Sequence, residues 1–191
     1  MNAEIMNDKK EEKLIKIADK ISRCRKCRLW KSRIKTVPGE GPADSDLFFV
    51  GEAPGKEEDE SGRPFVGRSG RLLTNMLNKV GIDRSKIFIT SILKCRPPHN
   101  RKPRKDEIEN CIGYLIEQLE VIKPKVIVLL GLVAIECLMG NHRNLREMHG
   151  KNIEKDGKIY FITYHPAAAR RSSRVRRIME EDLKKLKKMM D

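Results

Sequence analysis

Residues 46–67 read DLFFVGEAPGKEEDESGRPFVG, an apolar run followed by a long irregular loop. The run DLFFV (46–50) has the length and the aromatic and β-branched content of a buried strand. Similar runs recur at IFITS (87–91), KVIVLL (125–130) and IYFITY (159–164). These four segments predict a buried sheet, whereas the glycines, prolines and carboxylates after the first run suit neither a helix nor a strand.

Helical patterns separate the predicted strands. Apolar residues recur with a helical period in SGRLLTNMLNKV (69–80) and in KDEIENCIGYLIEQLEVI (105–122). We also predict a short helix at LVAIECLM (132–139) and a basic amphipathic helix at 178–191, and we expect residues 1–12 to be frayed. Alternating strands and helices predict one α/β domain over 1–191, with a mostly parallel four-stranded sheet that carries helices on both faces.

The charge balance favours a polyanionic partner. The 191 residues include 41 Lys and Arg against 27 Asp and Glu, a formal net charge of +14. Such an excess indicates nucleic acid, the alternative being a solvated surface in a salty or hot cytoplasm. The sequence has no apolar run of membrane-spanning length and no signal-peptide core at its N-terminus. We therefore expect a cytoplasmic monomer that binds no membrane.

The irregular loops should meet at one edge of the sheet. Ligands of parallel sheets bind beyond the carboxyl ends of the strands. After the four predicted strands the sequence places, in order, GEAPG (51–55), KCRPPHNRKPRK (94–105), LG (130–131) and HPAAARR (165–171). We therefore expect one functional crevice at this edge.

Three residues of this crevice favour a flat, polar ligand. Glu52 lies in a tight glycine and proline turn whose amides are free to bind a planar polar group, the alternative being a plain strand-to-helix turn. Glu52 favours the ligand, because a carboxylate at the strand end would otherwise only cost desolvation energy. Phe65 is placed to stack on a nucleobase, the alternative being an apolar plug that tethers its loop. His165 precedes Pro166 directly after a strand, which presents its imidazole to the crevice. The acidic run 56–60 is expected to be a solvated face.

Cysteine spacing indicates ligation, because a reducing cytosol disfavours disulfides. Cys24 and Cys27 form a CxxC, Cys95 lies in KCRPP, and Cys111 lies on the following predicted helix. Four thiolates from three segments suit zinc and an iron–sulfur cluster equally, the alternative being unrelated buried cysteines. Cys137, in an apolar helix, is expected to belong to the core.

Two basic clusters, residues 94–105 and 170–177, contain no carboxylate and flank the predicted crevice. Contacts from such clusters to phosphates provide affinity without reading sequence, whereas the alternative is a soluble loop.

Several motifs together resemble the family 4 uracil-DNA glycosylases of archaea and bacteria. They are GEAPGxxED (51–59), GRPFVG (62–67), KCRPPxNR (94–101), the four-cysteine spacing and HPA (165–167), and the similarity runs from about Cys24 to Arg170. The resemblance implies a three-layer α/β/α fold, a four-iron four-sulfur (4Fe-4S) cluster and removal of uracil from deaminated DNA.

By this resemblance, Cys24, Cys27, Cys95 and Cys111 hold a structural cluster. Glu52 and Ala53, with the adjacent Pro54, line the pocket beside the scissile bond. Phe65 stacks on the extruded base, His165 lies by the uracil O2, and the loop after His165 enters the minor groove. Glu52 and His165 are the expected catalytic residues. DNA phosphates are expected to contact Arg96, Asn100, Arg101, Arg170 and Arg171.

Two residues depart from glycosylase patterns. Ala53 stands where better-known uracil glycosylases carry an aspartate for the attacking water, as is usual in family 4. Ser91 stands where family 4 has an asparagine that pairs with uracil, and a hydroxyl satisfies fewer groups of the base edge than an amide does. We expect a monofunctional glycosylase, because no lysine is placed to form an imine. The alternatives are action on another deaminated base, such as hypoxanthine, or noncatalytic binding of damaged or single-stranded DNA.

Overall fold

The computed structural model describes residues 2–140 and 144–190. Its helices are α1 (Asn2–Ser22), α2 (Lys56–Ser61), α3 (Arg68–Lys79), α4 (Lys105–Ile122), α5 (Leu132–Met139), α6 (Leu145–Met148), α7 (Pro166–Arg171) and α8 (Ser173–Met190). Its strands are β1 (Leu47–Gly51), β2 (Phe88–Ser91), β3 (Val126–Leu130), β4 (Asn152–Lys155) and β5 (Lys158–Thr163). None of the helices in the described part of the chain is long and apolar enough to span a membrane.

The strands form one five-stranded sheet in the order β2-β1-β3-β5-β4. β2, β1, β3 and β5 are parallel, as predicted, and β4 pairs antiparallel with β5. We predicted a sheet of four strands, and this number is wrong, because the structure adds a fifth strand, β4. The segment NIEK is short, polar and only half-buried, which hides it from an apolar-run search. Its signal is the Asp156–Gly157 turn, where both residues have positive φ and close a hairpin.

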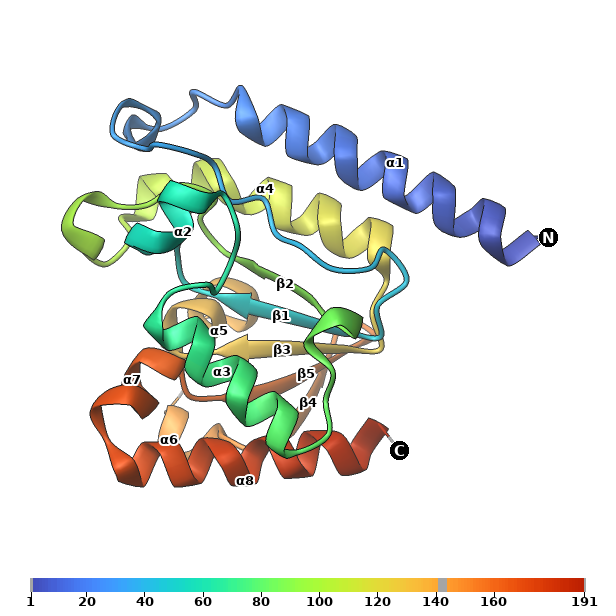
Figure 1. Cartoon of the computed structure of the whole chain (residues 1–191), viewed down its shortest axis with the longest axis vertical. Coiled ribbons are helices and arrows are strands. Elements are labelled where there is room, and N and C mark those ends of the chain that lie inside the picture. The colour runs from blue at the N-terminus through green and yellow to red at the C-terminus, as the bar shows by residue number, and fades with distance from the viewer. Residues whose placement is uncertain (1, 141–143, 191) are drawn as a thin grey trace.

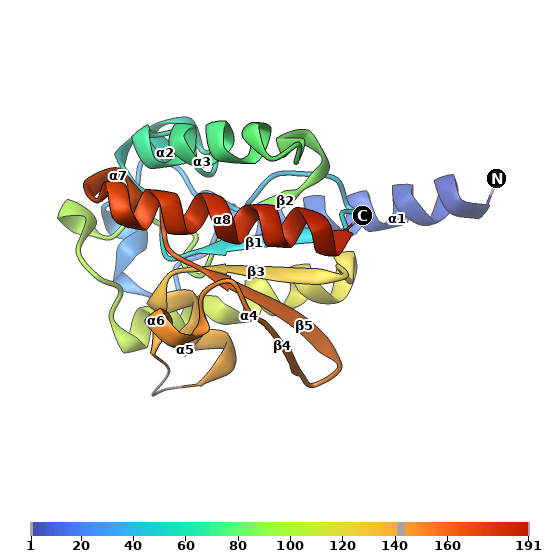
Figure 2. The same ribbon diagram turned by 90° about the horizontal axis from the view of Figure 1, so that it is seen from below.

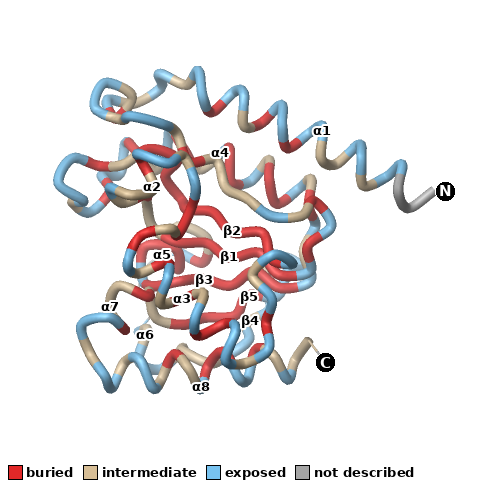
Figure 3. Tube along the Cα trace, in the orientation of Figure 1, coloured by how far each residue is buried: buried red, intermediate tan, exposed pale blue. Residues whose placement is uncertain are grey.

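Alternate residues of each strand face opposite layers of helices. Phe48 and Val50 of β1 belong to a core shared with α1, α4 and α5, whereas Leu47 and Phe49 belong to a core shared with α3 and α8. Figure 2 shows the sheet between α3 and α8 on one side and α4 and α5 on the other, and Figure 3 shows β1, β2 and β3 as buried. The arrangement is the three-layer α/β/α architecture that the resemblance implies.

The helices agree with the periodicity in the middle of the chain and depart from the predictions at both ends. α3, α4 and α5 occupy the predicted segments, whereas α8 begins at Ser173 rather than at residue 178. α1 is helical from Asn2, where we predicted a frayed segment over 1–12. Two contacts hold this part of the chain: Lys10 Nζ donates to Ile122 O at 3.1 Å, and Glu11 accepts from the Ala43 amide at 2.9 Å.

The four parallel strands end at the same edge of the sheet, where α2, α7 and the segment between β2 and α4 gather (Figure 1). This convergence of the loops is the predicted crevice edge. The resemblance implies a loop after His165, and this is wrong. The segment forms the short helix α7, which begins with Pro166 in its first turn.

Candidate active site

A cavity of about 520 Å³ lies at the carboxyl edge of the sheet, within the size range of ligand sites. It is lined by the six predicted base-binding residues Glu52, Ala53, Pro54, Phe65, Ser91 and His165. Of the predicted phosphate contacts, Asn100, Arg101, Arg170 and Arg171 also line it, and Arg96 does not. The structure therefore gathers residues from the ends of β1, β2 and β5 around one space.

Phe65 lines this cavity from the loop between α2 and α3. A Cβ at Gly51 would lie 2.4 Å from Phe65 Cζ, so the ring rests directly on the last residue of β1. The backbone of Phe65 has a φ of 53° and packs so closely on Gly70 that a Cβ there would lie 1.9 Å from Phe65 O. The residue is only 9% exposed, and its ring centroid lies 6.0 Å from that of His165. Phe65 thus anchors its loop while its ring still lines the cavity.

The acidic run 56–60 is only in part the solvated face that we predicted, because Lys56 and Glu60 are exposed whereas Glu58 and Asp59 point inward to backbone amides. It forms α2, and Glu58 accepts hydrogen bonds from the amides of Gly55 at 3.1 Å, Val66 at 2.9 Å and Gly67 at 2.8 Å. Asp59 is 2% exposed and accepts from the Ile34 amide. Glu58 therefore holds the Phe65 loop, whereas Asp59 holds the segment at Ile34, because each carboxylate satisfies backbone donors that have no other partner there.

His165 is a neutral imidazole with a defined proton. It is half-buried at the N-terminus of α7, and its Nδ1 accepts the Ala167 amide at 3.1 Å, so the proton resides on Nε2. Burial, aided by the charge of Arg171, lowers its pKa to about 4. Gly131, with a φ of +88°, lets the chain after β3 approach His165, since a Cβ there would lie 2.9 Å from His165 Cβ.

Glu52 is the half-buried carboxylate at the end of β1. Burial raises its pKa, and the nearby charges of Lys102 and Glu136 act in opposite directions on it. A carboxyl group with a raised pKa in a cavity wall is a candidate for acid–base chemistry.

Ser91 is fixed by a buried lysine that sequence analysis missed. Lys94 is 1% exposed, and its Nζ donates to Thr90 Oγ1 at 2.6 Å, Ser91 O at 2.9 Å and Gln118 Oε1 at 2.8 Å. Burial lowers the pKa of Lys94 to about 7. Thr90 and Gln118 in turn both donate to the carbonyl of Pro38. This closed network joins the end of β2 to α4, and its only signal in the sequence is a lysine directly after the apolar pair Ile92–Leu93.

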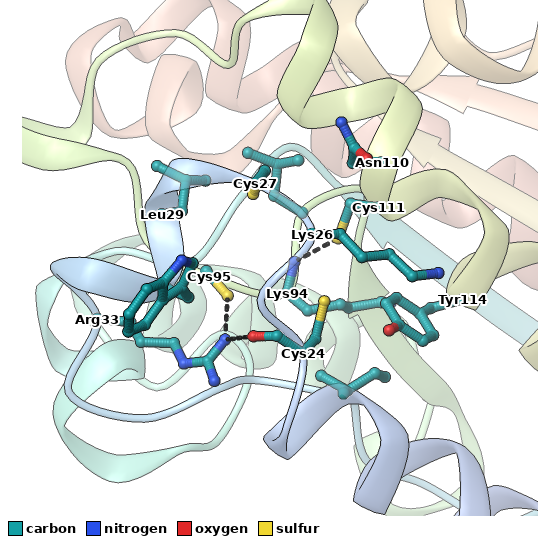
Figure 4. Close-up of a pocket in the computed structure, with 13 residues that line it drawn as sticks. Cys24, Lys26, Cys27, Leu29, Arg33, Lys94, Cys95, Asn110, Cys111 and Tyr114 are labelled. Carbon is teal, nitrogen blue, oxygen red and sulfur yellow. Dashed lines mark hydrogen bonds between the residues drawn. The ribbon is translucent and has the colours of Figure 1, made fainter.

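Cys24, Cys27, Cys95 and Cys111 surround a second, smaller pocket (Figure 4). Arg33 Nη1 donates to Cys95 Sγ and the Lys94 amide donates to Cys111 Sγ, both at 3.3 Å. Burial raises the pKa of the Cys27, Cys95 and Cys111 thiols, that of Cys111 to about 11. Over residues 2–140 and 144–190, no group of three His, Cys, Asp or Glu side chains is arranged to hold a single metal ion.

The donor set of this pocket is nonetheless all sulfur and comes from three separate segments, with N–H groups directed at two of the sulfurs. Such a set suits iron–sulfur chemistry, in which hydrogen bonds to sulfur are a usual feature. Cys137 stands apart from the pocket and packs against the core, as predicted.

The predicted phosphate contacts differ in how free their charges are. Arg101 forms a two-bond ion pair with Glu107, a side chain that is 0% exposed, so its charge ties the loop to α4. Arg96, which does not line the cavity, donates from Nε to Oδ1 of the cavity residue Asn100 at 2.7 Å. Arg170 and Arg171 lie exposed in the last turn of α7. Among these cations, the two in α7 are the freest to meet a phosphate.

Comparisons with known proteins agree with this geometry. Residues 38–187 match the family described as the Uracil DNA glycosylase superfamily. A type-4 uracil-DNA glycosylase from Sulfurisphaera tokodaii is 44% identical, over 93% of this chain and 85% of its own length. Those from Archaeoglobus fulgidus and Thermotoga maritima are 42% and 41% identical, over 92% and 93% of this chain and 92% and 95% of their own lengths. The chain belongs to the uracil-DNA glycosylase superfamily and, within it, to the type-4 uracil-DNA glycosylases.

Proposed function

We propose that this protein excises uracil from DNA, flipping the nucleotide into the cavity of about 520 Å³ and hydrolysing its N-glycosidic bond. The observation that carries the proposal is that Phe65, from the loop between α2 and α3, and His165, from the end of β5, line one cavity with ring centroids 6.0 Å apart. An aromatic face and a neutral N–H donor are what a flat base with carbonyl oxygens requires.

Phe65 supplies the binding energy for the extruded base. Flipping costs a few kcal/mol of unstacking and unpairing, and stacking on an aromatic side chain returns about 1–3 kcal/mol of it. Because Glu58 and Gly70 fix the loop, the ring is positioned before the base arrives. Little ordering entropy is then spent on binding.

His165 stabilises the departing base. As the bond between N1 of uracil and C1′ of the sugar breaks, its electron pair leaves with uracil and negative charge develops on N1 and O2. The Nε2 proton of His165 donates to this charge, and one such donor contributes roughly 2.7–4 kcal/mol. A histidine with a pKa of about 4 donates as a neutral group at neutral pH, so it needs no prior protonation.

Water completes the reaction by forming a bond to C1′ and losing one proton, which balances the negative charge that leaves with uracil. We assign Glu52 to orient this water, because it is the half-buried cavity carboxylate whose pKa burial raises. Lys56 also lines the cavity, but its side chain is exposed, and a lysine that is not desolvated is a weak nucleophile, so we expect no imine and no strand cleavage.

The contact that Ser91 offers to the edge of the base leaves a second substrate open. Its hydroxyl lines the cavity where family 4 has an amide, and loss of a two-bond contact costs about 1–3 kcal/mol of discrimination. Hypoxanthine is therefore a second candidate base. Binding of damaged or single-stranded DNA without catalysis is the alternative if no base is released.

The four cysteines of the second pocket would hold a 4Fe-4S cluster, with structural zinc as the rival. When bound, the cluster would cross-link the three segments and keep the loop that carries Asn100 and Arg101 in place. Hydrolysis of the N-glycosidic bond needs no redox step. Metal and sulfide analysis decides between the two: we expect about four irons and four sulfides per chain, and one zinc without sulfide would refute the cluster.

Uracil excision is tested with a uracil-containing duplex followed by alkali. We expect a break at uracil with wild-type protein, a loss of about 100-fold or more in rate for His165→Ala, and unchanged rate for His99→Asn, which alters an exposed histidine outside the cavity. A panel with uracil, hypoxanthine, xanthine and a thymine mismatch, repeated with Ser91→Asn, assigns the preferred base. If folded, metal-loaded protein cuts none of them, the enzyme assignment fails.

A further inference from the structure

The segment that carries Cys24 and Cys27 is strongly basic. Residues 23–35, RCRKCRLWKSRIK, contain seven Lys and Arg and no carboxylate. Arg25, Lys26, Arg28 and Lys31 are all exposed, and Figure 3 shows the segment as an exposed loop at the carboxyl edge of the sheet. We call these four residues the cysteine-loop patch. If these cations served only to keep the protein surface solvated, carboxylates would be interspersed among them. This loop has no carboxylate.

The charges of this patch are largely free of counter-ions. Arg25 and Lys31 lie over the ring of Trp30, at 4.9 and 6.0 Å from its centroid, and Lys26 lies 4.9 Å from that of Tyr114. Arg28 has Asp106 at 3.9 Å, a distance at which an exposed pair contributes little. For the described residues, Arg25, Lys26 and Lys31 make no ion pair. The rings hold the cations in place without neutralising them.

The patch is joined to the wall of the candidate active site. At the C-terminal end of the segment 23–35, which carries the patch, the amides of Ile34 and Lys35 donate to Asp59 of α2, at 3.0 Å in both cases. The first turn of α2, residues 56–58, lines the cavity. In Figure 1 the segment 23–35, which carries the patch, lies above α2, and α7 lies below α2. The cavity therefore has free cations on both sides.

We propose that the cysteine-loop patch is a second phosphate-binding surface, which holds the DNA duplex on the side of the flipped base opposite to Arg170 and Arg171. The proposal rests on the proposed function. B-DNA presents one phosphate charge per about 1.7 Å of its axis, so a duplex centred on the cavity runs over cations on both sides. One surface alone would leave the duplex free to pivot when the nucleotide is drawn out, whereas two fix its register.

The test compares two triple variants of the full, metal-loaded chain. Arg25→Gln, Lys26→Gln and Lys31→Gln together remove three patch charges. Lys86→Gln, Lys158→Gln and Lys188→Gln together remove three exposed charges near the opposite edge of the sheet or the far end of α8. Affinity for a uracil duplex of about 30 base pairs is measured against salt, with a single-stranded oligonucleotide of about five nucleotides as the reference that reaches little beyond the cavity.

We expect the patch variant to flatten the slope of log K against log salt by about 2.7, since each lost phosphate contact contributes about 0.9. At about 0.1 M salt its affinity for the long duplex should fall at least tenfold relative to the short oligonucleotide. The opposite-edge variant should change neither quantity. Equal slopes for the two variants on a duplex that wild-type protein cleaves would overturn the patch while leaving uracil excision intact.

Two further experiments distinguish loss of the patch charges from loss of the fold or of the metal in the patch variant. Arg25→Lys, Lys26→Arg and Lys31→Arg together keep the charge and should keep the wild-type slope. Wild-type protein bound to a duplex with photo-crosslinkers on phosphates along both flanks should give adducts within residues 25–31. Adducts confined to other segments would contradict the proposal without any substitution.

Discussion

Replacing Gly51 with alanine should displace the ring that receives the base. The added Cβ would lie 2.4 Å from Phe65 Cζ, 3.0 Å from Phe65 Cε2 and 3.3 Å from Ser91 Oγ. Carbon atoms in contact prefer about 3.5 Å or more, so the ring has to retreat by about 1.1 Å. Its backbone is fixed by Gly70 and by the bonds to Glu58, so the retreat goes into the cavity.

The expected cost in stability is modest and the cost in activity large. Overpacking of this kind destabilises by about 1–3 kcal/mol, which lowers Tm by about 2–12 °C for a chain of this size. Displacement by about 1 Å in an active site can cost 100-fold in rate. We therefore expect kcat/KM for uracil removal to fall about 100-fold, measured by single-turnover cleavage, in a protein that stays folded.

Two variants isolate the cause. Gly113→Ala adds a methyl group inside α4, where nothing lies within 4 Å, and should leave activity unchanged and stability equal or higher by about 0.5–1 kcal/mol. Combining Gly51→Ala with Phe65→Leu should recover stability, because the shorter side chain removes the clash, but not activity. Full activity and an unchanged Tm for Gly51→Ala alone would show that Phe65 does not rest on Gly51.

Three further predictions concern the residues that support the site. Because the pKa of His165 is about 4, His165 is neutral throughout pH 6–8, and replacing it by Asn should remove no inflection from the pH–rate profile in that range. The contribution of His165 to the rate should fall as pH drops through about 4, where protonation of Nδ1 displaces the Ala167 amide. Glu58→Ala leaves three loop amides without their acceptor and should lower kcat/KM at least tenfold. Glu58→Asp, which keeps a carboxylate, should recover part of this loss in kcat/KM. Lys94→Met leaves Ser91 O and Gln118 Oε1 buried without a donor, at about 1–3 kcal/mol each, and should lower the free energy of unfolding by about 2–6 kcal/mol; a change below about 0.5 kcal/mol would contradict the network.

The sequence predicted the edge of the sheet better than the supports beneath it. Apolar runs located β1, β2, β3 and β5, because parallel strands covered on both faces must be apolar throughout. The order of those strands brought Glu52, Phe65, Ser91 and His165 to one edge, as expected. β4 was missed because an edge strand in a hairpin needs no apolar run.

Roles that depend on pairing between distant residues could not be read from composition. Glu58 looks like one more surface carboxylate until the loop amides of Val66 and Gly67 meet it. Lys94 looks like one member of a basic cluster, yet it is fully enclosed by acceptors from β2 and α4. Arg101 was expected on a phosphate, but Glu107 binds its guanidinium. Each role is fixed by tertiary contacts between segments that no local pattern describes.

Fluorescence of 2-aminopurine placed beside uracil in a duplex measures base flipping directly, because the reporter brightens when its neighbour leaves the stack. With His165→Ala, which should bind without rapid cleavage, we expect a rise on binding that a duplex with cytosine in place of uracil does not show. The rise should be much smaller with Phe65→Ala. A duplex that binds to folded protein with no rise at uracil would contradict the account, because no nucleotide would then enter the cavity between Phe65 and His165.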